Sequence, residues 1–266
     1  MYECKKVKTS IIIPSWFVPG QHGKYCENET YWFAQECLKR LLNVTQMEEN
    51  ELIIIDNGST LEDDDIEPSF LKIHQYWEKA DILIRNKKNL GFAPSCNQGF
   101  AVAKGDYIVC LNNDVLVWEG WLDAMIEAFS VKVEIPVGVV MPALMRETKS
   151  ANEAIDWGDN INLGANYESL GVRAEFGSCW MIQRELLDKI KKEDGYIFDE
   201  NFKLGMGEDR DLWDRVRVHG FETYRTHKTR VFHQGNMTIG KVKDRRDYTY
   251  ENRKYLAQKR ETRLNS

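Results

Sequence analysis

The fold is decided by residues 105–115, which read GDYIVCLNNDV. Residues 107–111 are almost wholly apolar and do not alternate with polar ones, a pattern typical of a strand covered on both faces in an α/β sheet. The run ends in Asn112, Asn113 and Asp114, so it places two amides and a carboxylate where open α/β sheets bind their ligands. Such hard oxygen donors suit Mg²⁺ or Mn²⁺, and a metal of this kind can hold a diphosphate. An Asx turn after a strand explains the same residues equally well.

Three further apolar runs come earlier in the chain, and each ends in polar residues. They are residues 10–14, 51–55 and 81–84, and they are followed by Ser15-Trp16, by Asp56-Asn57-Gly58-Ser59 and by Arg85-Asn86 with Asn89 shortly after. Helical spacing of apolar residues from about Thr30 to Leu42, and again around Asn97, alternates with these runs. This alternation predicts a mostly parallel sheet with helices on both faces. Because the carboxyl ends of parallel strands meet along one edge, the four polar tips predict a site for a polar ligand.

The second half of the chain continues the same mixture. We expect strands at residues 137–142 and 177–182, short apolar stretches at 223–225 and 230–233, and helices at 122–129, 184–192 and 207–219. Residues 146–176 are polar and irregular, and we interpret them as a loop-rich region beside an acceptor.

The helix that opens with Gly-Glu-Asp-Arg-Asp at residues 207–211 carries a second candidate carboxylate. Asp209 lies three and four residues before the apolar residues Leu212 and Trp213, so its side chain shares their inward side. The positive end of the helix dipole accounts for acids at this position. It does not require one of them to face inward, and we therefore interpret Asp209 as functional.

Composition excludes several classes of protein. The chain has 266 residues, a net charge of −6 and no apolar run of about 18 residues, so it makes no general case for nucleic-acid binding and predicts no membrane-spanning helix. The first residues lack the apolar region of a signal peptide. Six cysteines are scattered without a C-x-x-C pair, and Cys96, Cys110 and Cys179 lie within apolar patterns. We expect them to be small core residues in a reducing, cytoplasmic protein.

Other charged residues have simpler explanations. Asp211 and Arg215 are spaced to pair on the outer face of their helix, and we expect His219 and His227 to be structural. Residues 241–266 contain nine basic and four acidic side chains, a net charge of +5. A solvated helix is the slightly favoured interpretation of this tail, and a surface for anionic lipid headgroups or another polyanion is the alternative.

Six motifs, taken together and in order, resemble those of family 2 glycosyltransferases. They are Ile11-Ile12-Ile13-Pro14-Ser15, Ile53-Ile54-Ile55-Asp56-Asn57-Gly58-Ser59, Asn89-Leu90-Gly91-Phe92 with Asn97, Leu111-Asn112-Asn113-Asp114, Gly207-Glu208-Asp209-Arg210-Asp211-Leu212, and His233. Each motif alone is weak, whereas six in order are specific. The resemblance covers roughly residues 9–235 and is greatest to the rhamnosyltransferase-like branch, in which the second strand ends in Asp-Asn-Gly-Ser. It implies a GT-A fold and a nucleotide-sugar-dependent, inverting reaction.

The resemblance also implies roles for individual residues. Pro14, Ser15 and Trp16 line the base and ribose, Asp56 and Asn57 read the base edge, and Asn89, Asn97, Asn112 and Asn113 border the nucleotide. Asp114 is the last residue of a D-x-D-like metal motif, His233 is a second residue on the metal side, and Asp209 is the catalytic base. Asn112 stands where the first acid of the metal motif is usual, Trp16 stands where a Tyr is common, and the loop at residues 18–29 is long.

The expected protein is therefore an inverting glycosyltransferase that uses Mn²⁺ or Mg²⁺ and a UDP- or dTDP-linked sugar donor. We expect one GT-A domain at residues 1–240, with a nucleotide-sugar half to about 117 and an acceptor half from 118, and a basic tail at 241–266. The expected acceptor is a glycan or lipid-linked glycan, reached at the inner face of a membrane through the tail. A non-glycan acceptor such as modified DNA, and a non-catalytic carbohydrate-binding or scaffold protein, remain alternatives. A Rossmann dehydrogenase is disfavoured because no G-x-G-x-x-G follows the first strand.

Overall fold

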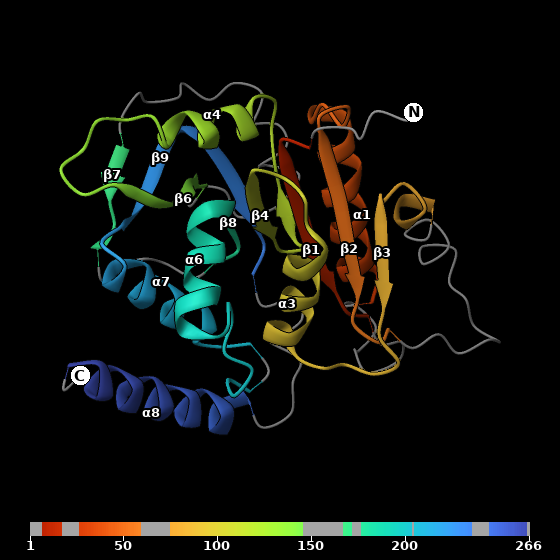
Figure 1. Ribbon diagram of the computed structural model, residues 1–266. Helices are drawn as coiled ribbons and strands as arrows, with labels where there is room; N and C mark the ends of the chain where they lie inside the picture. Colours follow the sequence, from red (N-terminus) through yellow and green to blue (C-terminus); the bar gives the residue numbers. More distant parts are fainter. Residues whose placement is uncertain are drawn as a thin grey trace, which may run out of the picture.

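The structure is a computed structural model that describes residues 7–17, 27–59, 75–145, 167–171, 177–203, 205–235 and 245–264, without the side chains of 27–32, 245 and 264. The described strands are β1 (Thr9–Ser15), β2 (Asn50–Asp56), β3 (Ile82–Arg85), β4 (Tyr107–Leu111), β5 (Val115–Leu116), β6 (Val137–Leu144), β7 (Tyr167–Ser169), β8 (Cys179–Gln183) and β9 (Glu222–His233). The described helices are α1 (Glu27–Val44), α3 (Phe92–Val102), α4 (Trp121–Ala128), α6 (Arg184–Asp194), α7 (Glu208–Val218) and α8 (Arg245–Leu264). Figure 1 shows the sheet at the centre of the molecule and α8 below it.

The strands form one sheet in the order β3-β2-β1-β4-β8-β6-β9-β5, with β7 paired to β9. Strands β1, β2, β3, β4, β6 and β9 run in one direction, and β5, β7 and β8 run against them. The predicted mostly parallel sheet is confirmed. The carboxyl ends of β1, β2, β3 and β4 consequently share one edge, which is the lower edge in Figure 1.

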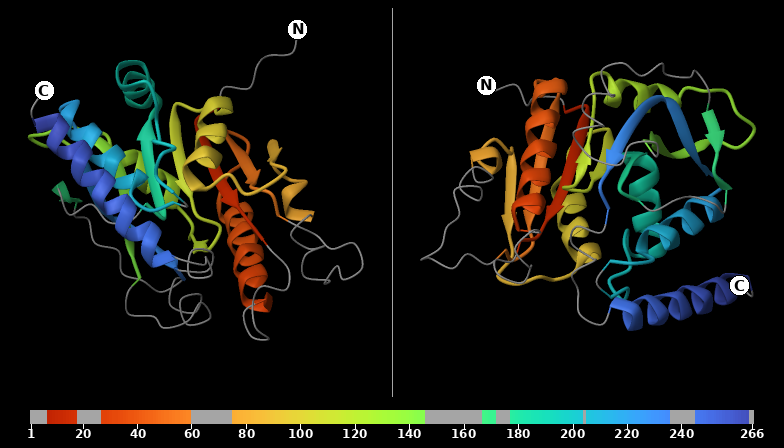
Figure 2. Two further views of the ribbon diagram at one scale, coloured as in Figure 1. Left: turned by 90° about the horizontal axis from the view of Figure 1, so that it is seen from below. Right: turned by 180° about the vertical axis from the view of Figure 1, so that it is seen from behind.

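Alternating side chains of the central strands divide the core into two layers. In β1, Ile11 and Ile13 belong to the layer covered by α1 and α4, whereas Ile12 belongs to the layer covered by α3, α6 and α7. Figure 2 shows these helices on opposite sides of the sheet. Gly99 permits the close packing of α3, because a Cβ atom there would come within 2.4 Å of the Ile12 side chain. The predicted helices on both faces are thus confirmed.

The cysteines expected in the core are there. Cys96, Cys110 and Cys179 are buried and free of disulfides, and the Cys96 and Cys110 sulfur atoms lie 3.7 Å apart. Burial also raises the pKa of the Cys37 thiol to about 12. These thiols act as small apolar core residues, as predicted.

Some expectations on boundaries and loops need adjustment. Helix α1 begins at Glu27, three residues before the predicted start, and residues 18–26 of the long loop lie outside the described residues. Most of the predicted loop-rich region at 146–176 also lies outside them, apart from β7 and the residues next to it. Within the described part of the chain, no helix combines the length and the apolar composition needed to cross a lipid bilayer.

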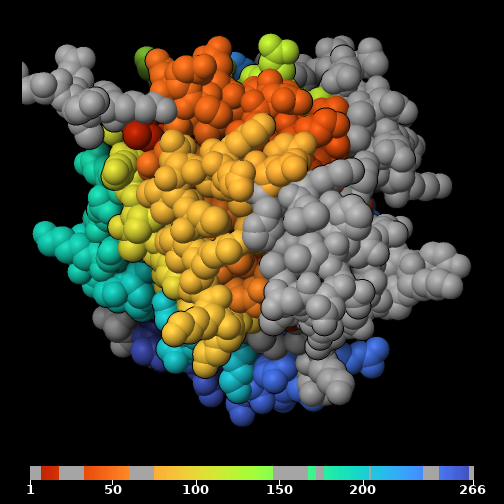
Figure 3. Space-filling view, turned by 90° about the vertical axis from the view of Figure 1, so that its right-hand side faces the viewer, coloured from red at the N-terminus to blue at the C-terminus, as the bar shows by residue number. Residues whose placement is uncertain are grey.

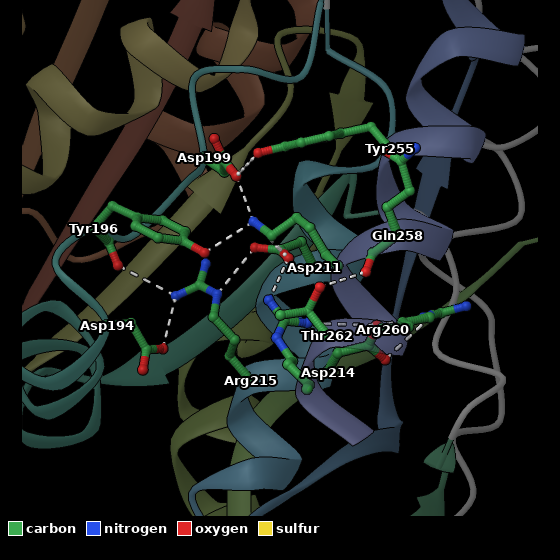
Figure 4. A network of polar contacts seen from close by, with 12 residues as sticks. Asp194, Tyr196, Asp199, Asp211, Asp214, Arg215, Tyr255, Gln258, Arg260 and Thr262 are labelled. Carbon is green, nitrogen blue, oxygen red and sulfur yellow. Dashed lines mark hydrogen bonds and ion pairs between the residues drawn. The ribbon is translucent and has the colours of Figure 1, made fainter. Parts of the chain in front are cut away.

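The basic tail forms the 20-residue helix α8, and its inner face is not solvated. Asp211 and Asp214 of α7 face α8 in Figure 4, and they pair with Arg263 and Arg260 of that helix. The predicted pair of Asp211 with Arg215 is present, with 3.0 Å between Oδ2 and Nε. Its predicted place on an outer face is wrong, because α8 covers this side of α7 and both side chains are buried.

Candidate active site

Asp114 and His233 meet at the edge of the sheet although they are far apart in the sequence. The chain leaves β4, turns through residues 112–114 and enters β5, where Val115 lies opposite His233 of β9. The Asp114 Oδ1 atom is 3.2 Å from His233 Nε2, and the Gln234 N–H donates to the Asp114 backbone oxygen at 3.3 Å. The strand pairing therefore brings the two predicted metal ligands together, while their role as ligands stays a prediction.

The donors at this position fit a divalent metal that is shared with a substrate. Among the described residues no cluster of three or more His, Cys, Asp or Glu side chains is suited to hold a metal alone. Asp114 and His233 would supply two ligands, and the buried Oδ1 atom of Asn112 has no hydrogen-bond partner in the described part of the chain. Mg²⁺ is usually bound in this way, by one or two carboxylates together with waters and substrate phosphates.

Asp209 lies in the first turn of α7 with its carboxylate directed inward, as predicted. Gly207 caps the helix at φ 117°, and the Asp209 side chain is buried. Its Oδ2 accepts a hydrogen bond from the Gly177 N–H at 2.9 Å, and its Oδ1 accepts one from the Arg210 N–H at 2.7 Å. Burial raises the pKa of Asp209, although these two N–H groups oppose the rise. A carboxyl group with a raised pKa is a better proton acceptor than an exposed one.

A chain of neighbouring residues connects Asp209 to the Asp114 turn. Gly177, which donates to Asp209, precedes Ser178, and the Ser178 carbonyl accepts a hydrogen bond from the Asn112 N–H at 2.8 Å. A Cβ atom at Gly177 would lie 3.0 Å from the Trp180 ring, a tight contact that glycine avoids. The two predicted acids thus occupy the same edge of the sheet, where β4 ends and β8 begins.

Glu208 is a buried acid whose unusual environment the sequence did not reveal. The side chain is 3% exposed, and its Oε2 atom has no hydrogen-bond partner in the described part of the chain. Burial, and next the charges of Asp209 and Asp211, raise the pKa of Glu208 well above its ordinary value. The run of acids at residues 208–211 was the available signal, but the helix dipole explained it without any burial.

The predicted base-binding residues surround the ends of β1 and β2. Ser15 pairs with Asp56 across the sheet, and the half-buried residues Pro14 and Trp16 flank Ser15. The Ser59 N–H donates to Asp56 Oδ1 at 3.0 Å, and Arg85 Nε lies 3.6 Å from Asp56 Oδ2. This arrangement holds Pro14, Ser15, Trp16 and Asp56 together beside the carboxyl edge of the sheet.

Asn57 is engaged entirely within the protein. Its Oδ1 accepts hydrogen bonds from Asn86 Nδ2 and the Leu90 N–H, and its Nδ2 donates to Asn89 Oδ1 and the Gly91 carbonyl, at distances of 2.8–3.1 Å. An asparagine amide offers two donors and two acceptor positions, and all four are used. Asn57 therefore fixes the loop that leads into α3, with Asn89 in the same network, and its part in reading the base edge stays a prediction.

Asn97 also has a structural position. Its Oδ1 accepts from the Phe198 N–H at 3.0 Å, and its Nδ2 donates to the Phe198 carbonyl and to Glu200 Oε1. These bonds tie α3 to the segment before α7, while the place of Asn97 at the border of the nucleotide stays a prediction. Asn112 and Asn113 remain in the Asp114 turn, where Asn113 is buried.

Comparison with known proteins agrees with this geometry. The model of the family described as "Glycosyl transferase family 2" matches residues 26–191. An uncharacterized glycosyltransferase of Methanocaldococcus jannaschii is 30% identical over 87 residues, which are 33% of this chain and 29% of that protein. The match therefore spans less than a third of this curated relative. Asp209 and His233 lie beyond the segment matched by the family model, so their assignment depends on the resemblance of the motifs and on the contacts described above.

Two solved structures share the fold. Residues 1–349 of TarS from S. aureus superpose with a TM-score of 0.56 at 12% identity, over 94% of this chain and 70% of that chain. The mannosyltransferase PcManGT from Pyrobaculum calidifontis, solved in complex with GDP-Man and Mn²⁺, gives 0.57 at 14% identity, over 85% of this chain and 56% of that chain. The predicted GT-A fold is confirmed, whereas the rhamnosyltransferase-like branch stays a prediction. Because the family model matches more than half of the sequence, the chain belongs to glycosyl transferase family 2.

Proposed function

We propose that the protein is an inverting glycosyltransferase that moves a sugar from a nucleoside-diphosphate sugar to a hydroxyl acceptor. The observation that carries this proposal is the meeting of two acids at one sheet edge. Asp114 contacts His233 there, and Asp209 is linked to the same turn through Gly177, Ser178 and Asn112. A carbohydrate-binding or scaffold protein does not require Asp114 and Asp209 to lie at the same sheet edge.

Asp114 and His233 are the residues that would hold a divalent metal. Their contact fixes the imidazole ring relative to the carboxylate, so both donors are already oriented. A metal bound there would supply positive charge to the diphosphate leaving group. Pro14, Ser15, Trp16 and Asp56 lie at the neighbouring strand ends and would receive the base and ribose.

Asp209 is the proposed general base. Two backbone N–H groups hold its carboxylate in one orientation, and its burial favours proton uptake. As the acceptor oxygen attacks the anomeric carbon, its proton passes to Asp209 and the bond to the diphosphate breaks. A single attack from the face opposite the leaving group inverts the anomeric centre. General-base assistance of this kind contributes about 10²–10⁴-fold to a rate.

The donor and the acceptor are proposed as classes. The neighbour solved with GDP-Man and Mn²⁺ supports a nucleotide sugar and a divalent metal, and we propose a UDP- or dTDP-linked donor with Mn²⁺ or Mg²⁺. A glycan or lipid-linked glycan is the proposed acceptor, in the cytoplasm or at the inner face of a membrane. Modified DNA is the alternative acceptor.

The first test is a panel of UDP-, dTDP- and GDP-sugars, each measured by thermal shift and by release of the nucleoside diphosphate with and without Mn²⁺. A ligand that binds the folded state raises the apparent stability. We expect one nucleotide to raise Tm only in the presence of metal and to be slowly hydrolysed. Binding of free oligosaccharides without any nucleotide response would favour the carbohydrate-binding alternative and contradict the proposal.

The general base is tested by Asp209→Asn. This variant should bind the donor as the wild type does and should transfer sugar about 10²–10⁴-fold more slowly. Asp123→Asn is the matched control, because Asp123 is an exposed helix acid that contacts only Lys8 among the described side chains. Transfer by Asp209→Asn at the wild-type rate would remove Asp209 from the mechanism.

A further inference from the structure

The two long faces of α8 differ in how their charges are used. On the inner face, Lys259 and Arg263 pair with the buried Asp211, with shortest distances of 2.9 and 2.5 Å, and Lys259 also contacts Asp199. On the outer face, Arg246 and Arg253 are exposed and form no ion pair within the described part of the chain. No acid of the described part of the chain therefore neutralises the charges of these two arginines.

The outer arginines border a hollow of about 370 Å³ on the helix surface. It is lined by Arg246, Thr249, Tyr250 and Arg253, which are spaced to share one face of a helix. Tyr250 is 72% exposed, which is unusual for a large aromatic side chain in a folded domain. Guanidinium groups bind carboxylates and phosphates in a bidentate manner, and a tyrosine ring offers an apolar face with a polar tip. This combination suits a sugar that carries an anionic group.

The hollow lies beside the turn that carries the candidate base. Thr249 Oγ1 is 3.2 Å from the Met206 sulfur, and Met206 precedes Asp209 by three residues. The Asn252 side chain bonds to both the N–H and the carbonyl of Lys203, which fixes this half of α8 against the same segment. In Figure 1, α8 lies on the side where β2 and β3 end, and in Figure 3 its residues (dark blue) follow the lower rim of the molecule.

We propose that this hollow on α8 is an acceptor subsite for an anionic glycan, with Arg246 and Arg253 binding its carboxylate or phosphate and Tyr250 packing on the sugar ring. The proposal rests on the proposed function and names the class of acceptor. A sugar unit of the acceptor that is bound at Thr249 would lie next to the turn that positions Asp209. The subsite would therefore hold the glycan while a hydroxyl of another of its units reaches the reaction centre.

The position of the basic side chains on α8 favours a glycan over a membrane surface. Recognition of anionic lipids typically uses a cluster of about four to eight basic residues. Lys259, Arg260 and Arg263 form ion pairs with acids of α7. Among the described α8 side chains, Arg246, Arg253 and Lys254 are basic and form no ion pair, and two of these three line one small hollow instead of a flat surface.

The test compares binding by the wild type and by the double variant Arg246→Ala/Arg253→Ala. The probes are an oligogalacturonate, a phosphorylated dextran oligosaccharide, neutral maltohexaose and vesicles containing phosphatidylserine. We expect the wild type to bind at least one anionic glycan in a salt-dependent manner and the double variant to bind it at least tenfold more weakly. Tyr250→Ala should weaken the same binding. Lys254→Ala, an exposed lysine of α8 that does not line the hollow, is the matched control.

Three outcomes would overturn the proposal: neither anionic glycan binds, the double variant binds as well as the wild type, or only the vesicles bind. Because Arg246 and Arg253 have no ion-pair partners in the described part of the chain, the double variant should retain the wild-type Tm, which shows that α8 is still docked. Donor hydrolysis with Mn²⁺ should also be unchanged. If the wild type did not hydrolyse any donor, the proposed function would be contradicted. The glycan-binding measurements would still test the subsite by themselves.

Discussion

The parallel strands β1 to β4 and the α7–α8 layer are held together by different forces. Strands β3, β2, β1 and β4 are parallel, and apolar side chains cover both of their faces. Helix α8 instead meets α7 through charged groups, and Asp211 alone contacts Arg215, Lys259 and Arg263 (Figure 4). The parallel strands are thus held by apolar packing, whereas α8 is attached largely by ion pairs.

The largest loss of stability is expected from Asp211→Ala, in the contact between α7 and α8. The Asp211 carboxylate is fully buried and is shared by three cationic side chains, so its removal takes one buried partner from each of them. Removing one partner from a buried ion pair costs about 3–5 kcal/mol. Urea unfolding should show a loss of this size, with Asp123→Ala as an exposed control that changes stability by less than about 0.5 kcal/mol. A loss below about 1 kcal/mol would show that α8 is held by its apolar contacts.

A smaller loss of stability is expected from Asn57→Ala, at the residue that follows β2. The substitution removes four hydrogen bonds of the buried Asn57 amide and leaves its partly buried partners without them, which costs about 1–3 kcal/mol. The loop before α3 should loosen, and amide hydrogen exchange at Leu90 and Gly91 should accelerate. If the variant kept its stability and exchange rates but lost discrimination between nucleotide bases, the result would favour the predicted base-reading role of Asn57 over a structural one.

The smallest effect is expected from Glu208→Gln, and it depends on pH. Burial, with the charges of Asp209 and Asp211, raises the pKa of Glu208 above its ordinary value of 4.5 in the folded protein. Its contribution to stability is therefore complete below about pH 4.5 and is lost as the pH rises through the folded pKa.

Glutamine cannot ionise, so the variant should be more stable than the wild type at pH 7, and this advantage should shrink towards pH 4. Thermal unfolding at both pH values measures the difference. Equal destabilisation at the two pH values would indicate a packing defect and would contradict a buried carboxyl group that resists ionisation.

Much of the fold was predictable from the sequence because its determinants are local. The runs at 10–14, 51–55 and 107–111 are strands within one or two residues of their predicted limits, since strands buried on both faces read as continuous apolar segments. The inward position of Asp209 followed from helical spacing in the same way. The contact between α7 and α8 was not predictable, because ion pairs between residues about 50 positions apart leave no local pattern.

The site was predictable in part. Asp114 and His233 came together as the motifs implied, whereas Asn57 and Asn97 proved to be bonded within the protein. An asparagine after a strand looks the same in sequence whether it binds a ligand or a neighbouring loop, since tertiary neighbours decide where its amide bonds. The burial of Glu208 was missed because acids at a helix start already have an explanation in the helix dipole.

The proposed function requires a metal at Asp114 and a base at Asp209 to act at the same edge of the sheet. The most direct test is a crystal structure with Mn²⁺ and the nucleoside diphosphate of the best donor, with anomalous data collected at the manganese edge. We predict an anomalous peak in contact with both the Asp114 carboxylate and the His233 imidazole, and an Asp209 carboxylate that faces the space beyond the diphosphate. A peak elsewhere, or an Asp209 carboxylate separated from the diphosphate by packed apolar side chains, would contradict the account.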